Sequence, residues 1–253
     1  MSVKPLLLSS EQLKGVREKL ERADECIRDL NTEIGAFLKH PEAGLSEHKA
    51  KAAQKFMEHA RSLAKNVPPR FGVLAGEIVH HLRSSLDHVA WMLSSERSQR
   101  AKGSNAIAFP ILIEEPTDEH ELRSYNRKIQ GIASPDALTL IKHLQPYNAT
   151  KPLDDPLAII HEFDRIDKHH NLVIVETSWE VGFRLPLSWI ISGSNIDTEI
   201  PSLAATRKAE LKITHFVAFP QFGERKNQPV VPSLTQLLDV TRDVVGKFAA
   251  LRT

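Results

Sequence analysis

The stretch GEIVHHLRSSLDHVAW, from Gly76 to Trp91, decides the fold because its apolar residues recur at the spacing of a long helix. One side of this helix is apolar and is expected to pack against the core: Ile78, Val79, Leu82, Leu86, Val89 and Leu93. At about 100° of rotation per residue, the other side gathers polar and aromatic residues in an arc of roughly 120°. These are Glu77, His80, His81, Ser84, Asp87, His88 and Trp91, with Arg83 beside the arc. A solvated face is the ordinary interpretation, but such faces are usually built from Lys and Glu, so this composition favours a functional face.

Helical patterns on either side of this stretch make the chain mainly helical. The central helix, at about 71–95, follows two others at about 10–38 and 46–64, with Pro and Gly residues between them. TDEHELRSYNRKIQG predicts a polar helix, and SPDALTLIKHLQP predicts a helix capped by Ser134 with Pro135 at its first position. The segment 156–169 and the stretch after Pro232 also have helical period.

The pattern changes to strands at Leu172. LVIVETSW, VGFRLPLSWII and LKITHFVAF are rich in β-branched and aromatic residues and are separated by turn-like loops, which favours antiparallel strands. We therefore predict an α+β, mainly α protein: a helical bundle with a small antiparallel β-sheet inserted before the C-terminal helix. Residues 1–253 are expected to form a single domain, with the bundle at 9–170 and 233–251 and the β-rich insertion at 171–231.

Composition narrows the class of protein. Hydrophobic residues make up 41% of the chain and charged residues 26%, which is typical of a folded soluble protein. The formal net charge of +1 gives no overall field that would attract nucleic acid or an anionic membrane, so any such surface is local. The chain has one cysteine, Cys26, which fits the reducing cytoplasm. It has no apolar run long enough to span a membrane, so we expect a cytoplasmic protein that contacts no membrane.

Four motifs along the chain carry a resemblance. GEIVHHLRSSLDHVAW resembles the GDxxHNLRSxLDHxAW helix of a widespread group of uncharacterised bacterial proteins. FPI at Phe109–Ile111, and the LQPY and IDKH motifs within residues 144–175, are similar to further segments of that group. The spacing from Arg83 to His88 resembles the signature of the HEPN superfamily, whose all-helical domains mostly cleave RNA.

The resemblance implies a cytoplasmic, HEPN-like, metal-independent endoribonuclease that uses no cofactor and is of a toxin or phage-defence type. It implies binding of RNA, a homodimer that shares a composite site, and a neutralising protein partner of unknown identity. His88 would be the general acid or base, since an imidazole exchanges protons near neutral pH, and Arg83 would hold the scissile phosphate. Asp87 or Glu77 would orient a histidine, and His80 completes the catalytic set. The supporting pocket would contain His81, Ser84, Trp91, Asp167, Lys168 and His169.

Two alternatives remain open from the residues. The first alternative depends on the segment HEFDRIDKHH. Its ordinary interpretation is a charged helix end that leads into a strand, and its functional interpretation is that IDKH faces the central helix. In the latter case a metal-binding, hydrolase-like protein is possible, with Glu77, His81, His88, Asp167 and His169 as ligands. The other alternative is a non-catalytic binding or sensory module, in which buried His and Asp side chains satisfy one another.

Overall fold

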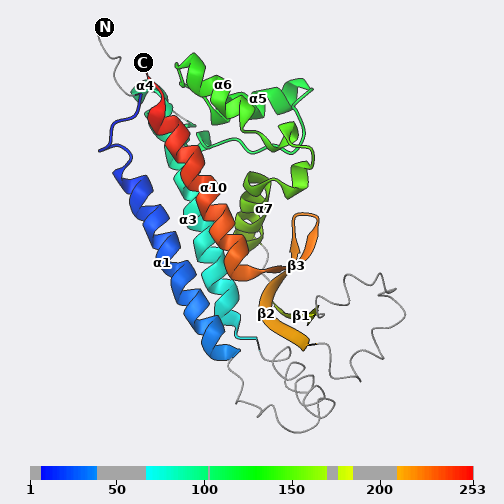
Figure 1. The fold of residues 1–253 in the computed structure, drawn as a ribbon. Coiled ribbons are helices and arrows are strands. Elements are labelled where there is room, and N and C mark those ends of the chain that lie inside the picture. Colours follow the sequence, from blue (N-terminus) through cyan, green and yellow to red (C-terminus); the bar gives the residue numbers. More distant parts are fainter. Residues whose placement is uncertain (1–6, 39–66, 102, 170–175, 185–209, 253) are drawn as a thin grey trace. The chain divides into compact units, whose positions relative to one another are not determined.

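The computed structural model describes residues 7–38, 67–101, 103–169, 176–184 and 210–252 (Figure 1). The predicted helix at 46–64, and residues 171–175 and 185–209 of the predicted β-rich insertion, lie outside the described residues. The chain divides into two compact units. The first unit contains Met1–Phe37, Pro68–Val175 and Phe219–Thr253, and the second contains Leu38–Val67 and Glu176–Ala218.

Long helices form the core of the first unit. Helices α1 (Lys14–Phe37), α3 (Pro69–Leu93) and α10 (Val230–Ala250) lie side by side, and α7 (Pro156–His169) packs against α3 and α10 (Figure 1). The helix predicted at 71–95 is thus confirmed as α3, which has Pro69 at its start and ends before the extended residue Ser94. Most of its predicted apolar side is buried, with Ile78, Val79, Leu82, Leu86 and Val89 excluded from solvent, while Leu93 at the end of the helix is half-buried. Burial of each such side chain contributes about 1.5–3 kcal/mol to stability.

Shorter helices connect α3 to α7. They are α4 (Glu96–Gln99), α5 (Glu119–Lys128), α6 (Pro135–His143) and single 3-10 turns at Ser104–Ala106, Pro146–Asn148 and Pro152–Asp154. The predicted cap of α6 is confirmed, because the Ser134 hydroxyl accepts a hydrogen bond from the Ala137 amide. Asp118 caps α5 in the same way through the Glu121 amide, at 2.8 Å.

A hairpin precedes α10 in the first unit. Strand β2 (Glu210–Phe222) ends there, and β3 (Arg225–Pro229) follows after a turn in which Gly223 has a φ of 65°. Only glycine adopts this conformation without strain. Phe219 and Phe222 of β2 stack with centroids 5.7 Å apart and both contact the ring of Phe163 in α7.

The second unit contains an antiparallel pair of strands. β1 (Glu176–Arg184) pairs with the first part of β2 in a register that runs from Glu176 opposite Ala218 to Arg184 opposite Glu210. Helices together with this small antiparallel sheet before α10 confirm the predicted α+β, mainly α fold class. None of the described helices has both the length and the apolar character needed to cross a membrane.

Candidate functional site

The polar residues of α3 are not all on one surface. Glu77, His80, His88 and Trp91 are exposed, and we call these four residues the α3 stripe. Arg83 lies at the edge of the predicted arc and is turned inward, so that only 6% of its surface is exposed. The sequence placed Arg83 and His88 in one site, but the structure gives them different surroundings.

Arg83 and Asp87 together bind the backbone of Phe109. The Arg83 guanidinium donates to the Phe109 carbonyl oxygen at 2.9 Å, and the Phe109 amide donates to Asp87 Oδ1 at 2.9 Å. The two side chains also form an ion pair, with 2.9 Å between Arg83 Nη2 and Asp87 Oδ1. Both polar backbone groups of Phe109 are therefore satisfied by one turn of α3.

Gln145, the glutamine of the LQPY motif, binds the same extended chain further along. Its side-chain amide donates to the Pro110 carbonyl at 2.9 Å and accepts from the Leu112 amide at 3.1 Å. A third bond, to the Ile141 carbonyl at 2.9 Å, fixes the Gln145 side chain to the last turn of α6. Residues 107–113, which we call the 107–113 segment, belong to none of the described strands, so side chains supply bonds that a sheet would otherwise supply.

These contacts explain why RSSLD, FPI and LQPY occur together in one chain. Arg83, Asp87 and Gln145 hold the extended segment whose centre is FPI, and Phe109 is fully buried against Phe248 of α10 with ring centroids 6.0 Å apart. The segment is therefore a fixed wall of the first unit.

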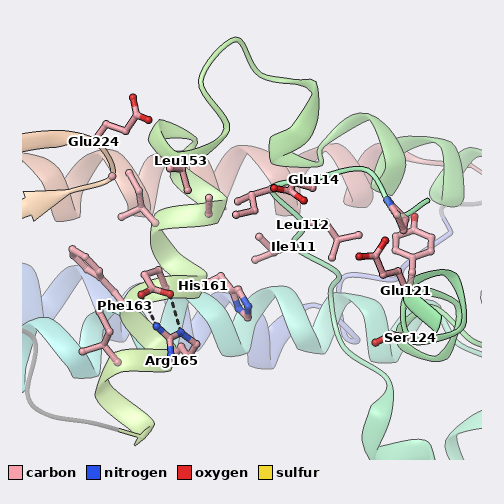
Figure 2. Close-up of a pocket in the computed structure, with 18 of the residues that line it drawn as sticks. Ile111, Leu112, Glu114, Glu121, Ser124, Leu153, His161, Phe163, Arg165 and Glu224 are labelled. Carbon is pink, nitrogen blue, oxygen red and sulfur yellow. Dashed lines mark hydrogen bonds and ion pairs between the residues drawn. The ribbon is translucent and has the colours of Figure 1, made fainter. Parts of the chain in front are cut away.

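A groove of about 1050 Å³ lies beside this wall. Its lining comes from the 107–113 segment, α5, α7, the Pro152–Asp154 turn and the β2–β3 hairpin, as Figure 2 shows for the labelled residues. Much of the lining is apolar: Ile111, Leu112, Ile113, Leu153, Ile159 and Phe163. Ile113 and Leu153 are 44% and 48% exposed, so the groove presents apolar side chains to the solvent.

His161 is the most perturbed titratable group of the groove. Burial, followed by the positive charges of Arg83 and Lys128, lowers the pKa of His161 to about 4, so its imidazole is neutral at physiological pH. Its Nδ1 atom is buried and has no hydrogen-bond partner within the described residues.

Two other titratable groups of the groove are also perturbed by burial. Burial and the charge of Arg83 lower the pKa of Lys128, whereas Asp87 acts in the opposite direction. Burial raises the pKa of Tyr125. Exposed carboxylates of the lining are found at Glu114, Glu121, Glu162 and Glu224, and Glu162 is paired with Arg165 at 2.7 Å (Figure 2).

A second polar cluster joins α7 to α3. The buried carboxylate of Asp164 lies 3.1 Å from His80 Nδ1 and 2.7 Å from Lys168 Nζ. Asp167 packs so closely against Gly76 that a Cβ atom at this glycine would overlap its carboxylate. Asp167 and Lys168 of the predicted supporting pocket thus lie at α3, while the side chain of His169 lies outside the described residues.

The remaining predicted residues lie along α3. His88 is exposed, and its Nδ1 atom is bonded to the Ser84 carbonyl at 2.7 Å. His81 has a buried Nδ1 atom that finds no partner among the described residues, and burial lowers its pKa. Trp91 is 37% exposed and Glu77 is exposed. Among the residues that the structure describes, no three His, Cys, Asp or Glu side chains come together in a group that would hold a metal ion.

Sequence reasoning did not identify Lys128 or Gln145 as candidate site residues, and it noted His161 and Asp164 only as members of a helix end whose two interpretations stayed open. His161 and Asp164 lie within the quoted HEFDRIDKHH segment, and Gln145 lies within LQPY. One available signal was FPI itself, because an apolar extended run between helices needs partners for its backbone. No protein-family model, curated protein or solved structure matches the chain.

Proposed function

We propose that this protein is a binding module that takes a small organic ligand in the groove. The observation that carries the proposal is a groove of about 1050 Å³ with a largely apolar lining and a few convergent polar groups. Small-molecule sites usually combine these features, and groups with perturbed pKa values cluster in them. The bonds from Arg83, Asp87 and Gln145 to the 107–113 segment support a preformed wall, which lowers the entropic cost of binding.

The low pKa of the His161 imidazole favours ligand binding over acid–base catalysis as the role of this residue. A general base works best when its pKa lies near the operating pH, whereas the pKa of His161 is about 4. A neutral imidazole in the lining carries one donor and one acceptor nitrogen and is suited to recognise a ligand by hydrogen bonding. The buried thiol of Cys26 agrees with a reducing compartment, and we propose a cytoplasmic location.

A thermal-shift screen of small organic compounds tests the proposal. Ligands of the groove are expected to raise the melting temperature of the wild type, and Ser124→Trp, which places a large side chain in the lining, is expected to abolish the shift. Leu153→Asp places a charge at the groove and is expected to weaken binding. Leu122→Asp is the matched control, because Leu122 is similarly exposed and is not in the lining. Equal shifts in all three variants would contradict the proposal.

A second candidate is the endoribonuclease activity that the HEPN resemblance implies, in a homodimer of the toxin or phage-defence type. It is supported by the His80–Asp164 pair, in which a buried carboxylate orients a histidine whose side chain is 49% exposed. Lys168 adds a positive charge beside the pair for an RNA phosphate, and His88 lies on the same α3 stripe. Arg83, held by Phe109 and Asp87, has a structural role in this proposal.

Cleavage of a fluorescent RNA in the presence of EDTA tests this second candidate. His80→Asn is expected to lower the rate by about 10²- to 10⁴-fold, the usual contribution of a positioned general acid or base. His143→Asn, which changes an exposed histidine of α6, is the control and is expected to leave the rate unchanged. Absence of cleavage by the wild type, or full activity of His80→Asn, would exclude the candidate.

A further inference from the structure

One cation of the groove, Lys128, has no ion pair among the described residues, unlike the charged residues around it on α3 and α7. Arg83 is neutralised by Asp87, and Asp164 is neutralised by Lys168. Lys128 lines the groove and is half-buried, and its ammonium has no ion-pair partner in the part of the chain that the structure describes. A positive charge that is partly removed from water and unpaired favours an anion beside it.

Hydrogen-bond donors near this charge are also unused. His161 lines the groove, and its Nδ1 atom has no partner within the described residues. The Nη1 atom of Arg83 is buried and likewise has no partner there, and the charge of Arg83 acts on both Lys128 and His161. Buried polar atoms are nearly always satisfied in proteins, so the unpaired ring nitrogen of His161, a residue of the lining, favours a ligand that carries a hydrogen-bonding group.

The rest of the lining defines the remainder of the ligand. Ile111, Ile159 and Phe163 offer apolar surface, which a hydrocarbon or aromatic body would cover. Glu114, Glu121 and Glu224 are exposed carboxylates of the same groove and would repel a chain of negative charges such as a nucleic acid. A single anionic group on an apolar body satisfies both requirements.

We propose that the ligand of the groove is an organic monocarboxylate with an aliphatic or aromatic body, and that its carboxylate lies between Lys128 and His161. This inference rests on the proposed binding function and adds the chemical class of the ligand. The apolar body lies against Ile111, Ile159 and Phe163. The carboxylate accepts hydrogen bonds from the Lys128 ammonium and from the His161 ring in its suitable tautomer.

Calorimetric titration of the full chain with octanoate, octanol and octylamine tests the inference, because these probes share one chain length and differ in charge. The wild type is expected to bind octanoate at least about tenfold more tightly than octanol. The reason is that the octanoate carboxylate forms a charge-assisted hydrogen bond with Lys128, whereas the octanol hydroxyl carries no charge. Lys128→Met is expected to remove this preference while octanol binding is retained, and Lys128→Arg is expected to keep it. Lys226→Met is the matched control, because Lys226 is an exposed lysine outside the lining.

The outcomes separate the two proposals. If octanol or octylamine binds the wild type as tightly as octanoate, or if Lys128→Met keeps the preference, the monocarboxylate assignment is overturned and the binding function stands. If none of the three probes binds, both proposals are overturned. Circular dichroism of Lys128→Met and Lys128→Arg verifies that each variant keeps the helical content of the wild type.

Discussion

Replacing Arg83 by Met tests whether this residue is structural. The substitution keeps the length of the side chain but removes the ion pair with Asp87 and the bond to the Phe109 carbonyl, both at 2.9 Å. Removing one partner of a buried pair costs about 3–5 kcal/mol. Because the side chain of Asp87 is 33% exposed, water hydrates the remaining carboxylate, and we expect the free energy of unfolding to fall by about 2–3 kcal/mol.

Urea denaturation followed by far-ultraviolet circular dichroism measures this loss. With an m value of about 3 kcal/mol/M, the midpoint is expected to fall by about 0.7–1 M. Arg123→Met is the matched control, because Arg123 and Glu119 also form an i,i+4 ion pair at 2.9 Å but are 69% and 84% exposed. The control is expected to lose less than about 0.5 kcal/mol. Equal losses in the two variants would refute a structural role for Arg83.

Four further substitutions test the roles of His161, Gln145 and the packing of α7 on α3. For His161, the pKa is lowered from 6.5 to about 4 in the folded state, so its contribution to stability is full above pH 6.5 and is lost as the pH falls toward 4. His161→Gln is expected to reduce the loss of unfolding free energy between pH 6.5 and 4 by about 1–2 kcal/mol, after discounting for solvent screening. A profile of stability against pH that does not change in the variant would contradict burial of the neutral imidazole. Gln145→Leu removes the hydrogen bonds to Pro110 and Leu112 and is expected to lower the free energy of unfolding by about 2–3 kcal/mol. It is also expected to speed hydrogen exchange of the Leu112 amide, and slow exchange in the variant would disprove the role of Gln145. Gly76→Ala is expected to lower the free energy of unfolding by about 1–2 kcal/mol, because the new Cβ atom overlaps the side chain of Asp167. Gly246→Ala in α10 is the control and is expected to raise the free energy of unfolding by about 0.5–1 kcal/mol, because its new Cβ atom meets no other atom. If thermal unfolding shows the same sign of change for both variants, the close packing of α7 on α3 is contradicted.

The sequence predicted the elements of the fold better than their contacts. The apolar spacing of α3 and the Ser134 cap of α6 are local signals, and both were confirmed. The direction of Arg83 was not predictable in the same way, because it depends on Phe109, which lies 26 residues further along the chain. Likewise, the HEFDRIDKHH segment does not reveal that His161 lines a groove whereas Asp164 meets His80. These differences arise from how the 107–113 segment and α7 pack on α3, and no local sequence pattern specifies that packing.

Amide chemical-shift mapping during titration with octanoate tests the central claim most directly. The account predicts shifts at Ile111, Leu112, Lys128 and His161, which come from the 107–113 segment, α5 and α7 around one groove. Shifts confined to the α3 stripe, or no shifts at saturating octanoate, would contradict it.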